Sequence, residues 1–338
     1  MQHEILAAGP LLGPAGELRE PGFARRELLA YDPRPLSRLR LKEWDFYATT
    51  TREMTFSCAV AHGGVAGVVG ATLIDFRTRT IRERALVTPL GWRCALPRSS
   101  LSGDVAFRLG GVEVDFRVGA GRREIRLRWP RFDASGAPLE VDLSAEEPPG
   151  RESLVAATPL GPRGFFYERK MPAMPTTGRI AAGPVRLELD ERSGAFTTLD
   201  WGRGVWPYRT RWIWASGAGR LADGRVFGLN LGEVSGDASA ATENAFFLDG
   251  RLHKLDEVEF LRDPADAAAG PWRLRGPRVE LELSANLYQM RKRIDLLAIA
   301  SDLRQITGEY SGHVMTDAGE RIPVAGVIGW AEEHRARW

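Results

Sequence analysis

Apolar and polar residues alternate over short segments along most of this chain. In 54–61, apolar side chains alternate with small or polar ones, and the segments 105–109, 112–118 and 124–129 follow the same pattern. Alternation with a period of two is typical of strands that bury one face. Long segments with a helical period are absent. The pattern therefore predicts a chain built from many short strands.

Turn motifs built on glycine separate these segments. They recur at roughly ten-residue spacing, which is typical of an all-β barrel or sandwich. Gly-Gly and Asp-Gly pairs allow the positive φ angles that two-residue hairpin turns need. The motifs are Gly63-Gly64, Gly110-Gly111, 119–122, Ser193-Gly194, Asp223-Gly224, Asp249-Gly250 and 317–319.

Composition divides the predicted β structure into two units. Residues 1–35 are rich in Gly, Pro and Leu without a clear period, and we interpret them as an irregular N-terminal segment. The segment 147–153, EPPGRES, is a linker candidate because it combines a Pro pair, Gly and charges. We predict a first β unit over 36–150 and a second over 151–338. The helical candidates are few and short, at 263–269 and after Trp330.

The overall composition indicates a globular protein with little net charge. The chain is 43% hydrophobic, with a mean hydropathy of -0.24 and a formal net charge of +2, so no strong field attracts nucleic acid. Cys58 and Cys94 are the only cysteines, and the five His are scattered without metal-binding spacing. Nucleotide-binding loops are absent as well. We therefore expect no disulfide scaffold, no metal and no cofactor.

The sequence also gives no sign of a membrane span or a secretion signal. The apolar run 58–74 is interrupted by His62 and several glycines, so it falls short of a membrane span. The first 14 residues lack the basic region of a signal peptide. We therefore expect a cytoplasmic protein without an integral membrane segment, whose oligomeric state the sequence leaves open.

The segment 199–244 carries the strongest candidate site, because it places four Trp and a few polar side chains on consecutive predicted strands. Trp212 and Trp214 lie two residues apart, so a strand points both to one face. Tyr208, Thr210 and Ser216 share that face, and 209, 211, 213 and 215 form the other. The aromatic face either packs a core or lines a pocket for a mostly apolar ligand.

Asp200 lies just before this aromatic strand and is the candidate catalytic residue. A carboxyl group among indole rings is desolvated, which raises its pKa and keeps it protonated near neutrality. Such an acid can protonate an alkene while the Trp faces stabilise the developing cation. The alternative is an ordinary ion pair between Asp200 and Arg203 at a strand end.

Further polar residues are candidates for ligand binding. Asn230 is flanked by glycines on the next predicted strand, and either fixes a ligand or satisfies a neighbouring strand. Glu243 and Asn244 either close the floor of a pocket or cap a turn. Asp45 and Tyr47 share one strand face, which is either solvated or carries an acid–phenol pair for proton transfer.

A cluster near the C-terminus comprises Glu332, Glu333 and His334. It could supply an acid and a base, but we interpret it as a salt link that closes a barrel.

Several strings of uncommon residues resemble the bacterial DUF2804 family, a domain of unknown function. They are RLKEWDFY (40–47), GRGVWPYRTRWIWASG (202–217), FGLNLG (227–232), ATENAFFLDGRLHKL (241–255) and GWAEEHRARW (329–338). In that family the segment before the first Pro of the 170s carries Asn or His beside Lys. This chain instead has Glu168, Arg169 and Lys170, so the role of that segment stays open.

The succession Asp-Trp-Gly, Trp-x-Trp and Asp-Gly is also similar, more remotely, to the double-lipocalin group that includes carotenoid hydratases and hydroxyneurosporene synthase-like proteins. This resemblance implies two calycin-like (lipocalin-like) barrel or sandwich units. It also implies acid-catalysed hydration, isomerisation or cyclisation of an apolar substrate, with Asp200 as the acid.

The sequence therefore predicts an all-β protein that binds an apolar small molecule, such as an isoprenoid, fatty acyl or polyketide-like ligand. Two other functions stay open. One is a non-catalytic lipid carrier or sensor, whose pocket needs aromatic rings but no protonated acid. The other is a structural β protein with a Trp-packed interior and no cavity.

Overall fold

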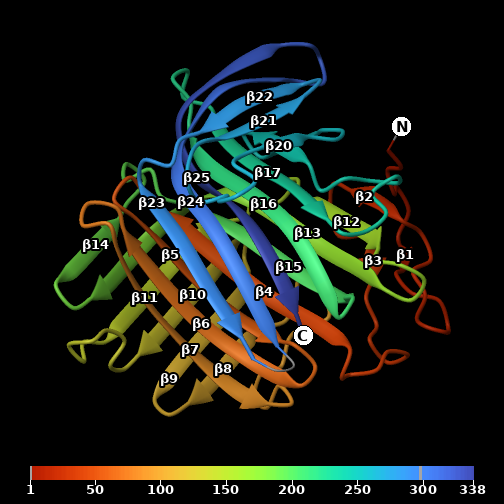
Figure 1. Cartoon of the computed structure of the whole chain (residues 1–338), viewed down its shortest axis with the longest axis horizontal. Helices are drawn as coiled ribbons and strands as arrows, with labels where there is room; N and C mark the ends of the chain where they lie inside the picture. The colour runs from red at the N-terminus through yellow and green to blue at the C-terminus, as the bar shows by residue number, and fades with distance from the viewer. Residues whose placement is uncertain (1, 297–298) are drawn as a thin grey trace.

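Two large curled antiparallel sheets make up most of the molecule (Figure 1). The computed structural model describes residues 2–296 and 299–338, and in these ranges the backbone forms 25 strands and no helix. It follows that no helix of the described residues is able to cross a membrane.

The first sheet contains the strands between residues 22 and 205. Its main order is β7-β6-β5-β4-β15-β13-β11-β10-β9-β8, with β12 and β14 paired to β13 and β2 paired to β12. The strands are β2 (Gly22–Ala24), β4 (Leu41–Thr50), β5 (Met54–His62), β6 (Ala66–Asp75), β7 (Thr80–Pro89), β8 (Val105–Leu109), β9 (Val112–Gly119), β10 (Arg122–Trp129), β11 (Leu139–Glu146), β12 (Leu154–Pro159), β13 (Phe165–Ala182), β14 (Val185–Leu189) and β15 (Phe196–Val205). The short strands β1 (Gly9–Pro10) and β3 (Leu29–Ala30) form a separate parallel pair.

The second sheet contains every strand after residue 208. Its order is β19-β18-β17-β16-β25-β24-β22-β21-β20, with β23 paired to β24. The strands are β16 (Arg209–Arg220), β17 (Val226–Val234), β18 (Ala245–Leu248), β19 (Arg251–Lys254), β20 (Glu259–Leu261), β21 (Trp272–Gly276), β22 (Val279–Leu283), β23 (Tyr288–Asp295), β24 (Ala300–Met315) and β25 (Arg321–Arg337).

The chain changes from one sheet to the other at residues 206–208. The segment 147–153, which the composition marks as a linker, is a surface connection between β11 and β12, and both of these strands belong to the first sheet. A segment rich in Pro, Gly and charged residues indicates an exposed connection. It does not indicate which sheet the flanking strands join, because that depends on the distant strands with which they pair.

The turn motifs lie where strands reverse. Gly110-Gly111 joins β8 to β9 and Asp249-Gly250 joins β18 to β19, and all four residues have positive φ. This is the backbone of the two-residue hairpin turn that favours glycine.

Both predicted helical segments are wrong. In 263–269 the side chains of Asp263 and Asp266 accept hydrogen bonds from the backbone N–H groups two residues ahead, at 2.8 and 3.1 Å. These Asx turns replace a helix start. Residues after Trp330 belong to β25, which pairs with β16 on one side and β24 on the other. Sheet pairing on both edges overrides the local preference for helix.

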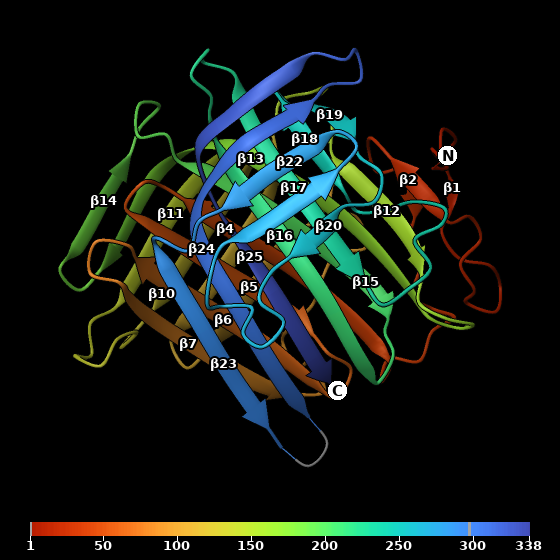
Figure 2. The same cartoon turned by 45° about the horizontal axis from the view of Figure 1, so that its top comes forward.

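Each sheet has its own apolar core, and a third set of contacts lies between the sheets. The core of the first sheet contains Tyr47 and Trp201, and that of the second contains Ile213 and Trp272. Smaller clusters join the two sheets, for example Phe46 and Ala48 of β4 with Trp214 of β16 and Trp330 of β25. Figure 2 shows the long strands β16, β25, β24 and β23 lying over β4–β7.

Candidate functional site

An aromatic-lined cavity lies between the two sheets. Its volume is about 480 Å³, within the roughly 300–1,000 Å³ usual for small-molecule sites. The first sheet supplies one wall from β4–β7, β13 and β15, and the second supplies the other from β16, β17 and β23–β25. Its aromatic lining comprises Trp44, Phe46, Phe166, Trp206, Trp212, Trp214, Trp330, Trp338 and His334.

Strand alternation explains why these rings face the cavity. On β16, Trp212 and Trp214 line the cavity while Ile213 and Ala215 point into the core of the second sheet. On β4, Trp44, Phe46 and Ala48 line the cavity while Tyr47 points into the core of the first sheet. The cavity is thus the space between the outward faces of two sheets that each bury their other face.

Two glycines make room for cavity side chains. A Cβ atom at Gly202 would lie 2.3 Å from the Trp44 ring, and one at Gly232 would lie 2.3 Å from the carboxyl carbon of Glu243. Any larger residue at either position would displace a side chain that lines the site.

Aromatic rings pack edge to face around the space. The Trp214 ring centroid lies 5.2 Å from that of Trp330 and 5.8 Å from that of Phe46, with both pairs nearly perpendicular. Trp206 packs against Trp212 with centroids 5.9 Å apart. These edge-to-face contacts hold the rings in defined orientations around the cavity.

Lys170 is the centre of a buried charge cluster at one end of the cavity. Its ammonium lies 2.8 Å from Asp200 Oδ1, 3.2 Å from Glu168 Oε2 and 3.8 Å from Glu243 Oε2. The same ammonium lies 4.6 Å from the centroid of the Trp214 ring, in a cation–π contact. Burial alone lowers the pKa of Lys170, but attraction to the three carboxyl groups outweighs it, so the net pKa is raised and the group is charged.

Glu168 and Glu243 share this cluster, and burial disfavours a negative charge on both. Burial and the neighbouring Glu243 carboxyl raise the pKa of Glu168 well above its usual value, and burial also raises the pKa of Glu243. One ammonium facing three carboxyl groups leaves an excess of negative charge, which a shared proton relieves.

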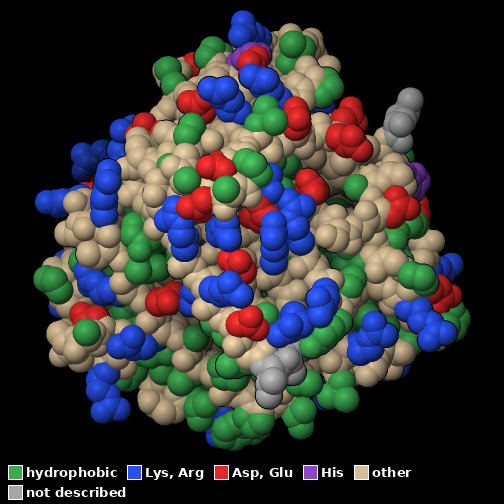
Figure 3. Space-filling model, viewed as in Figure 1, with side chains coloured by type: hydrophobic (Ala, Val, Ile, Leu, Met, Phe, Trp, Pro, Cys, Tyr) green, Lys and Arg blue, Asp and Glu red, His purple; other side chains and the backbone are tan. Residues whose placement is uncertain are grey.

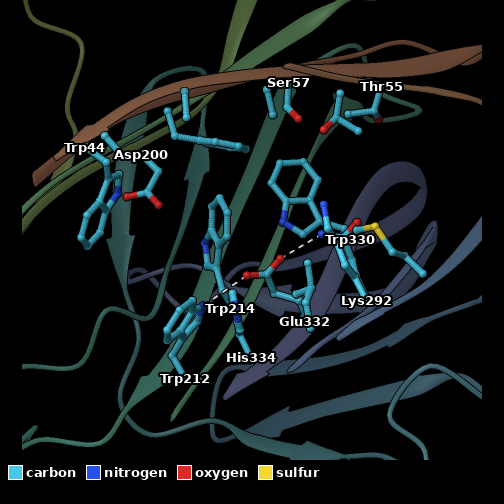
Figure 4. Close-up of a pocket in the computed structure, with 18 of the residues that line it drawn as sticks. Trp44, Thr55, Ser57, Asp200, Trp212, Trp214, Lys292, Trp330, Glu332 and His334 are labelled. Atoms are coloured by element: carbon cyan, nitrogen blue, oxygen red, sulfur yellow. Dashed lines mark hydrogen bonds between the residues drawn. The ribbon is translucent and has the colours of Figure 1, made fainter. Parts of the chain in front are cut away.

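Glu332 of β25 reaches into the cavity from the second sheet. Its Oε1 accepts a hydrogen bond from Trp212 Nε1 at 3.2 Å, and its Oε2 accepts one from Gln305 Nε2 at 2.9 Å (Figure 4). Burial raises the pKa of this carboxyl, because these two neutral donors compensate only part of the lost hydration. Burial therefore favours the protonated form of Glu332, whose carboxyl group lines the cavity.

His334 lies next to this acid on the same strand face. Its ring centroid is 4.2 Å from that of Trp212, and its Nε2 is 2.7 Å from Ser301 Oγ. Burial lowers the pKa of His334 to about 4, so the imidazole is neutral near pH 7.

Four of the residues that the sequence predicts for the site line the cavity. They are Asp200, Trp212, Trp214 and Glu243. Asp200 pairs with Lys170 and not with Arg203, because strand residues three apart point to opposite faces. Arg203 instead binds Asp45 at 2.8 Å on the other face of the sheet.

Asn230 and Asn244 support the cavity from behind. The Asn230 side chain accepts a hydrogen bond from Trp214 Nε1 at 2.8 Å and donates one to the Glu243 carbonyl at 2.8 Å. Asn244 accepts a hydrogen bond from the Gly232 N–H at 2.8 Å. The Asn230 amide therefore orients two residues of the lining, whereas Asn244 holds the backbone of β17.

Asp45, Tyr47 and Tyr208 lie away from the cavity. Asp45 and Tyr47 share one strand face, as predicted, but that face points into the first sheet, where Tyr47 accepts a hydrogen bond from Arg123 at 3.1 Å. Tyr208 lies in the connection between the sheets with 51% of its surface exposed.

Sequence reasoning left the role of Lys170 open and, although Glu332 could supply an acid, interpreted it as part of a salt link. Lys170 is one of only four lysines in the chain and sits between aromatic and Met-rich segments, which is a signal for a buried charge. Trp330, Glu332 and His334 alternate, and a strand interpretation of 330–334 would have placed them on one face. Their neighbour Glu333 forms the expected salt links on the opposite face, with Arg211 at 3.0 Å and Arg262 at 2.6 Å.

The carboxyl groups of the cavity surround an ammonium and not an empty cation site. In the residues that the structure describes, no group of three or more His, Cys, Asp or Glu side chains could hold a metal ion. The side chains that line the site offer carboxyl groups, an ammonium, a neutral imidazole and aromatic faces.

A model of the family described as Domain of unknown function (DUF2804) matches residues 2–338. The chain belongs to this family. No curated protein matches the sequence.

Solved structures with this fold include two proteins of about the same length. CghA with Sch210972 matches with a TM-score of 0.56 at 14% identity, over 88% of this chain and 89% of that chain. Kievitone hydratase from Nectria haematococca matches with a TM-score of 0.54 at 13% identity, over 86% of this chain and 88% of that chain. The likeness confirms the expected fold class, an all-β chain of two lipocalin-like units.

Proposed function

We propose that this protein binds an apolar, unsaturated small molecule in the cavity between its sheets and catalyses a proton-transfer reaction on it. The observation that carries the proposal is the buried carboxyl group of Glu332, whose raised pKa favours the protonated form, in the same aromatic cavity as Asp200, which pairs with Lys170. Aromatic faces dominate the lining, so an isoprenoid, fatty acyl or polyketide-like molecule fits its chemistry.

Glu332 is suited to act as the general acid. A carboxyl group that is neutral at working pH can donate its proton, and both of its oxygens are held by Trp212 and Gln305. Proton transfer to an alkene carbon creates a cation, which the faces of Trp212, Trp214 and Trp330 stabilise.

Asp200 is suited to act as the base, which differs from the role as acid that the sequence suggests. Lys170 holds its Oδ1 at 2.8 Å, so folding supplies Asp200 with a cationic partner. Figure 4 shows Asp200 and Trp44 at one end of the cavity, with the Glu332 carboxyl between there and Trp330. A substrate lying across the indole faces would then have an acid and a base at different atoms.

Hydration illustrates the balance of the reaction. Glu332 donates its proton to one alkene carbon, the oxygen of a water molecule bonds to the other carbon, and Asp200 takes the proton that water releases. Transfer of a proton from Asp200 back to Glu332, through solvent, restores both groups. If Asp200 removes a proton from carbon instead, the result is an isomerisation, and attack by a second alkene gives a cyclisation. Kievitone hydratase has the same fold, and the hydration that its name describes supports this class of reaction.

Mass spectrometry of small molecules that co-purify with the native protein is the first test, because it needs no assumed substrate. We expect an apolar molecule with carbon–carbon double bonds. Turnover of that molecule is then compared for Glu332→Gln and Asp200→Asn, with the exposed Glu233→Gln and Asp190→Asn as matched controls. We expect each cavity variant to lose at least about a hundredfold in rate, the usual contribution of one acid or base.

The same comparison separates an enzyme from a carrier. A carrier would bind the extracted molecule with unchanged affinity in both cavity variants and would show no turnover in the wild type. That result would remove the catalytic part of the proposal. The structural alternative required a Trp-packed interior with no void, and the cavity of about 480 Å³ disagrees with it.

A further inference from the structure

A group of large apolar side chains is exposed at one end of the first sheet, and we name it the outer apolar patch. It comprises Leu39, Val65, Val68, Val87, Leu90 and Trp92, whose exposed fractions run from 39% for Val68 to 68% for Val87. Figure 3 shows hydrophobic side chains gathered along the lower edge of the molecule.

Backbone contacts show that these residues form one surface. The Leu90 N–H donates to the Val65 carbonyl at 2.9 Å, and Val68 pairs directly with Val87 across β6 and β7. The backbone of Leu39 packs against Gly64, next to Val65. Three segments distant in sequence thus meet at this end of the sheet.

The segments that form the patch carry charge of a single sign. The three segments that form it, 37–42, 63–69 and 86–94, contain Arg38, Arg40, Lys42 and Arg93 and no Asp or Glu. The whole chain has 46 basic and 44 acidic residues, whereas the charged residues of these three segments are all basic. Arg93 lies over the Trp92 ring, 4.4 Å from its centroid.

The patch continues into the cavity along one row of the sheet. Trp44 pairs with Ala61, Ala61 with Val68, and Val68 with Val87. Directly paired residues share one face, and the first two of the row line the cavity while the last two are exposed. Lys42 marks the boundary, since its ammonium binds the Gly63 carbonyl at 2.5 Å and lies 5.7 Å from the ring of Trp338, which lines the cavity.

We propose that the outer apolar patch docks on an anionic lipid bilayer, so that an apolar ligand enters the cavity along this row without crossing water. Exposed Leu, Val and Trp side chains partition into the headgroup region, and the surrounding Arg side chains are attracted to anionic lipid. A second copy of the chain is a poor occupant, because a symmetric contact would set the same basic residues against each other.

Flotation of the full chain with vesicles tests the docking. We expect binding to vesicles of phosphatidylcholine mixed with phosphatidylserine, and much weaker binding to phosphatidylcholine alone. The double variant Leu90→Ser/Trp92→Ser should bind at least about tenfold more weakly, because it removes most of the inserted apolar area. Its matched control, Leu6→Ser/Leu101→Ser, removes two exposed apolar side chains elsewhere and should bind like the wild type.

A charge-matched comparison tests the basic residues. The affinity of the triple variant Arg38→Gln/Arg40→Gln/Arg93→Gln for the anionic vesicles should fall about fivefold per Arg at low salt. The loss should be smaller at higher salt, which screens the attraction. The control Arg19→Gln/Arg117→Gln/Arg192→Gln removes the same charge from other exposed positions and should lose little.

Three results would overturn the docking proposal. The first is absence of vesicle binding by the wild type, and the second is an equal loss in the patch variants and their controls. The third is a dimer in sedimentation velocity that Leu90→Ser/Trp92→Ser dissociates, which would show that a second copy covers the patch. Vesicle binding is measured without turnover, so its result is independent of whether the proposed reaction is correct.

Discussion

The Glu332 carboxyl should make the stability of the protein depend on pH in a defined direction. Its pKa is raised in the folded state, so its stabilising contribution is complete below the unfolded pKa near 4.3 and is lost as pH rises toward the folded pKa. Glu332→Gln removes this loss. Relative to the wild type, the free energy of unfolding of the variant should therefore rise by up to about 1.4 kcal/mol per pH unit over that interval.

Urea unfolding at a series of pH values measures this difference. Glu333→Gln, at the neighbouring residue, is the matched control. The pKa of Glu333 is shifted in the opposite direction, so the pH dependence of its contribution to stability is reversed. Burial raises the pKa of Glu333, but hydrogen bonds from Arg262, Arg211 and Arg335 lower it to about 2, so its contribution is present above the unfolded pKa and lost only in acid. A stability difference between Glu332→Gln and wild type that is flat from pH 4 to 8 would show that Glu332 is not a buried neutral acid.

Asn230 should contribute to stability because it makes two hydrogen bonds in a position without access to solvent. Asn230→Ala leaves the Trp214 N–H and the Glu243 carbonyl without their partner in a fully buried position. The expected loss is about 2–4 kcal/mol in the free energy of unfolding, because two buried polar groups lose a hydrogen bond. Chemical denaturation measures it, with the exposed Asn286→Ala expected within about 0.5 kcal/mol of wild type. Equal stability of the two variants would contradict the role assigned to Asn230.

The residues that sequence reasoning found and missed differ in the range of their contacts. The common face of Trp212 and Trp214 follows from strand geometry alone. The partner of Asp200 does not, because Lys170 meets it through the pairing of β13 with β15. Asp45 and Tyr47 share a face as predicted, yet only the position of the second sheet decides which face of β4 lines the cavity.

At the scale of elements, β13 has an irregularity directly after the residues that it contributes to the charge cluster. The register of β13 against β15 shifts between Met171 and Met174, and Ala173 has a positive φ of 59°. Arg151 Nη2 donates to the carbonyls of Pro172 and Ala173 at 3.1 and 2.7 Å. Arg151 therefore satisfies the two carbonyls that the bulge removes from the sheet.

Arg151→Met should destabilise this bulge. The expected loss is about 2–3 kcal/mol in the free energy of unfolding, since two carbonyls lose a charged donor. Arg192→Met, at a side chain that is 92% exposed, is the control and should change stability by less than about 0.5 kcal/mol. Thermal or urea unfolding measures the stability of both variants. An Arg151→Met variant as stable as the control would mean that water replaces the guanidinium.

Local patterns in the sequence predict the hairpins well and the long strands less well. Asp249-Gly250 and Gly110-Gly111 are sufficient to predict their hairpins, because the conformation of a tight turn is determined by its own residues. The segment after Trp330 reads as a helix by composition, and it becomes a strand because β16 and β24 hydrogen-bond to both of its edges. Information of that kind lies in segments that are distant along the chain.

At the scale of the whole molecule, the cavity exists because two sheets with separate cores meet through their outer faces. Filling that space should abolish ligand binding without unfolding either core. Ala59 lies on the cavity wall formed by β5, and its neighbour across the β5–β6 pair is Gly70, which leaves room beside it. Ala59→Phe places a ring in the space while the Cys58 and Val60 side chains stay in the core.

Fluorescence titration with 1-anilinonaphthalene-8-sulfonate, an apolar probe, measures the effect. We expect Ala59→Phe to weaken probe binding at least about tenfold and to change the free energy of unfolding by less than about 1.5 kcal/mol, because the ring enters a void and not a packed core. Ala106→Phe adds the same ring at an exposed position of β8 and should leave binding unchanged. Unchanged probe affinity in Ala59→Phe would place the binding site outside the space between the sheets. A large loss of stability would mean instead that the two sheets are already in close contact at Ala59.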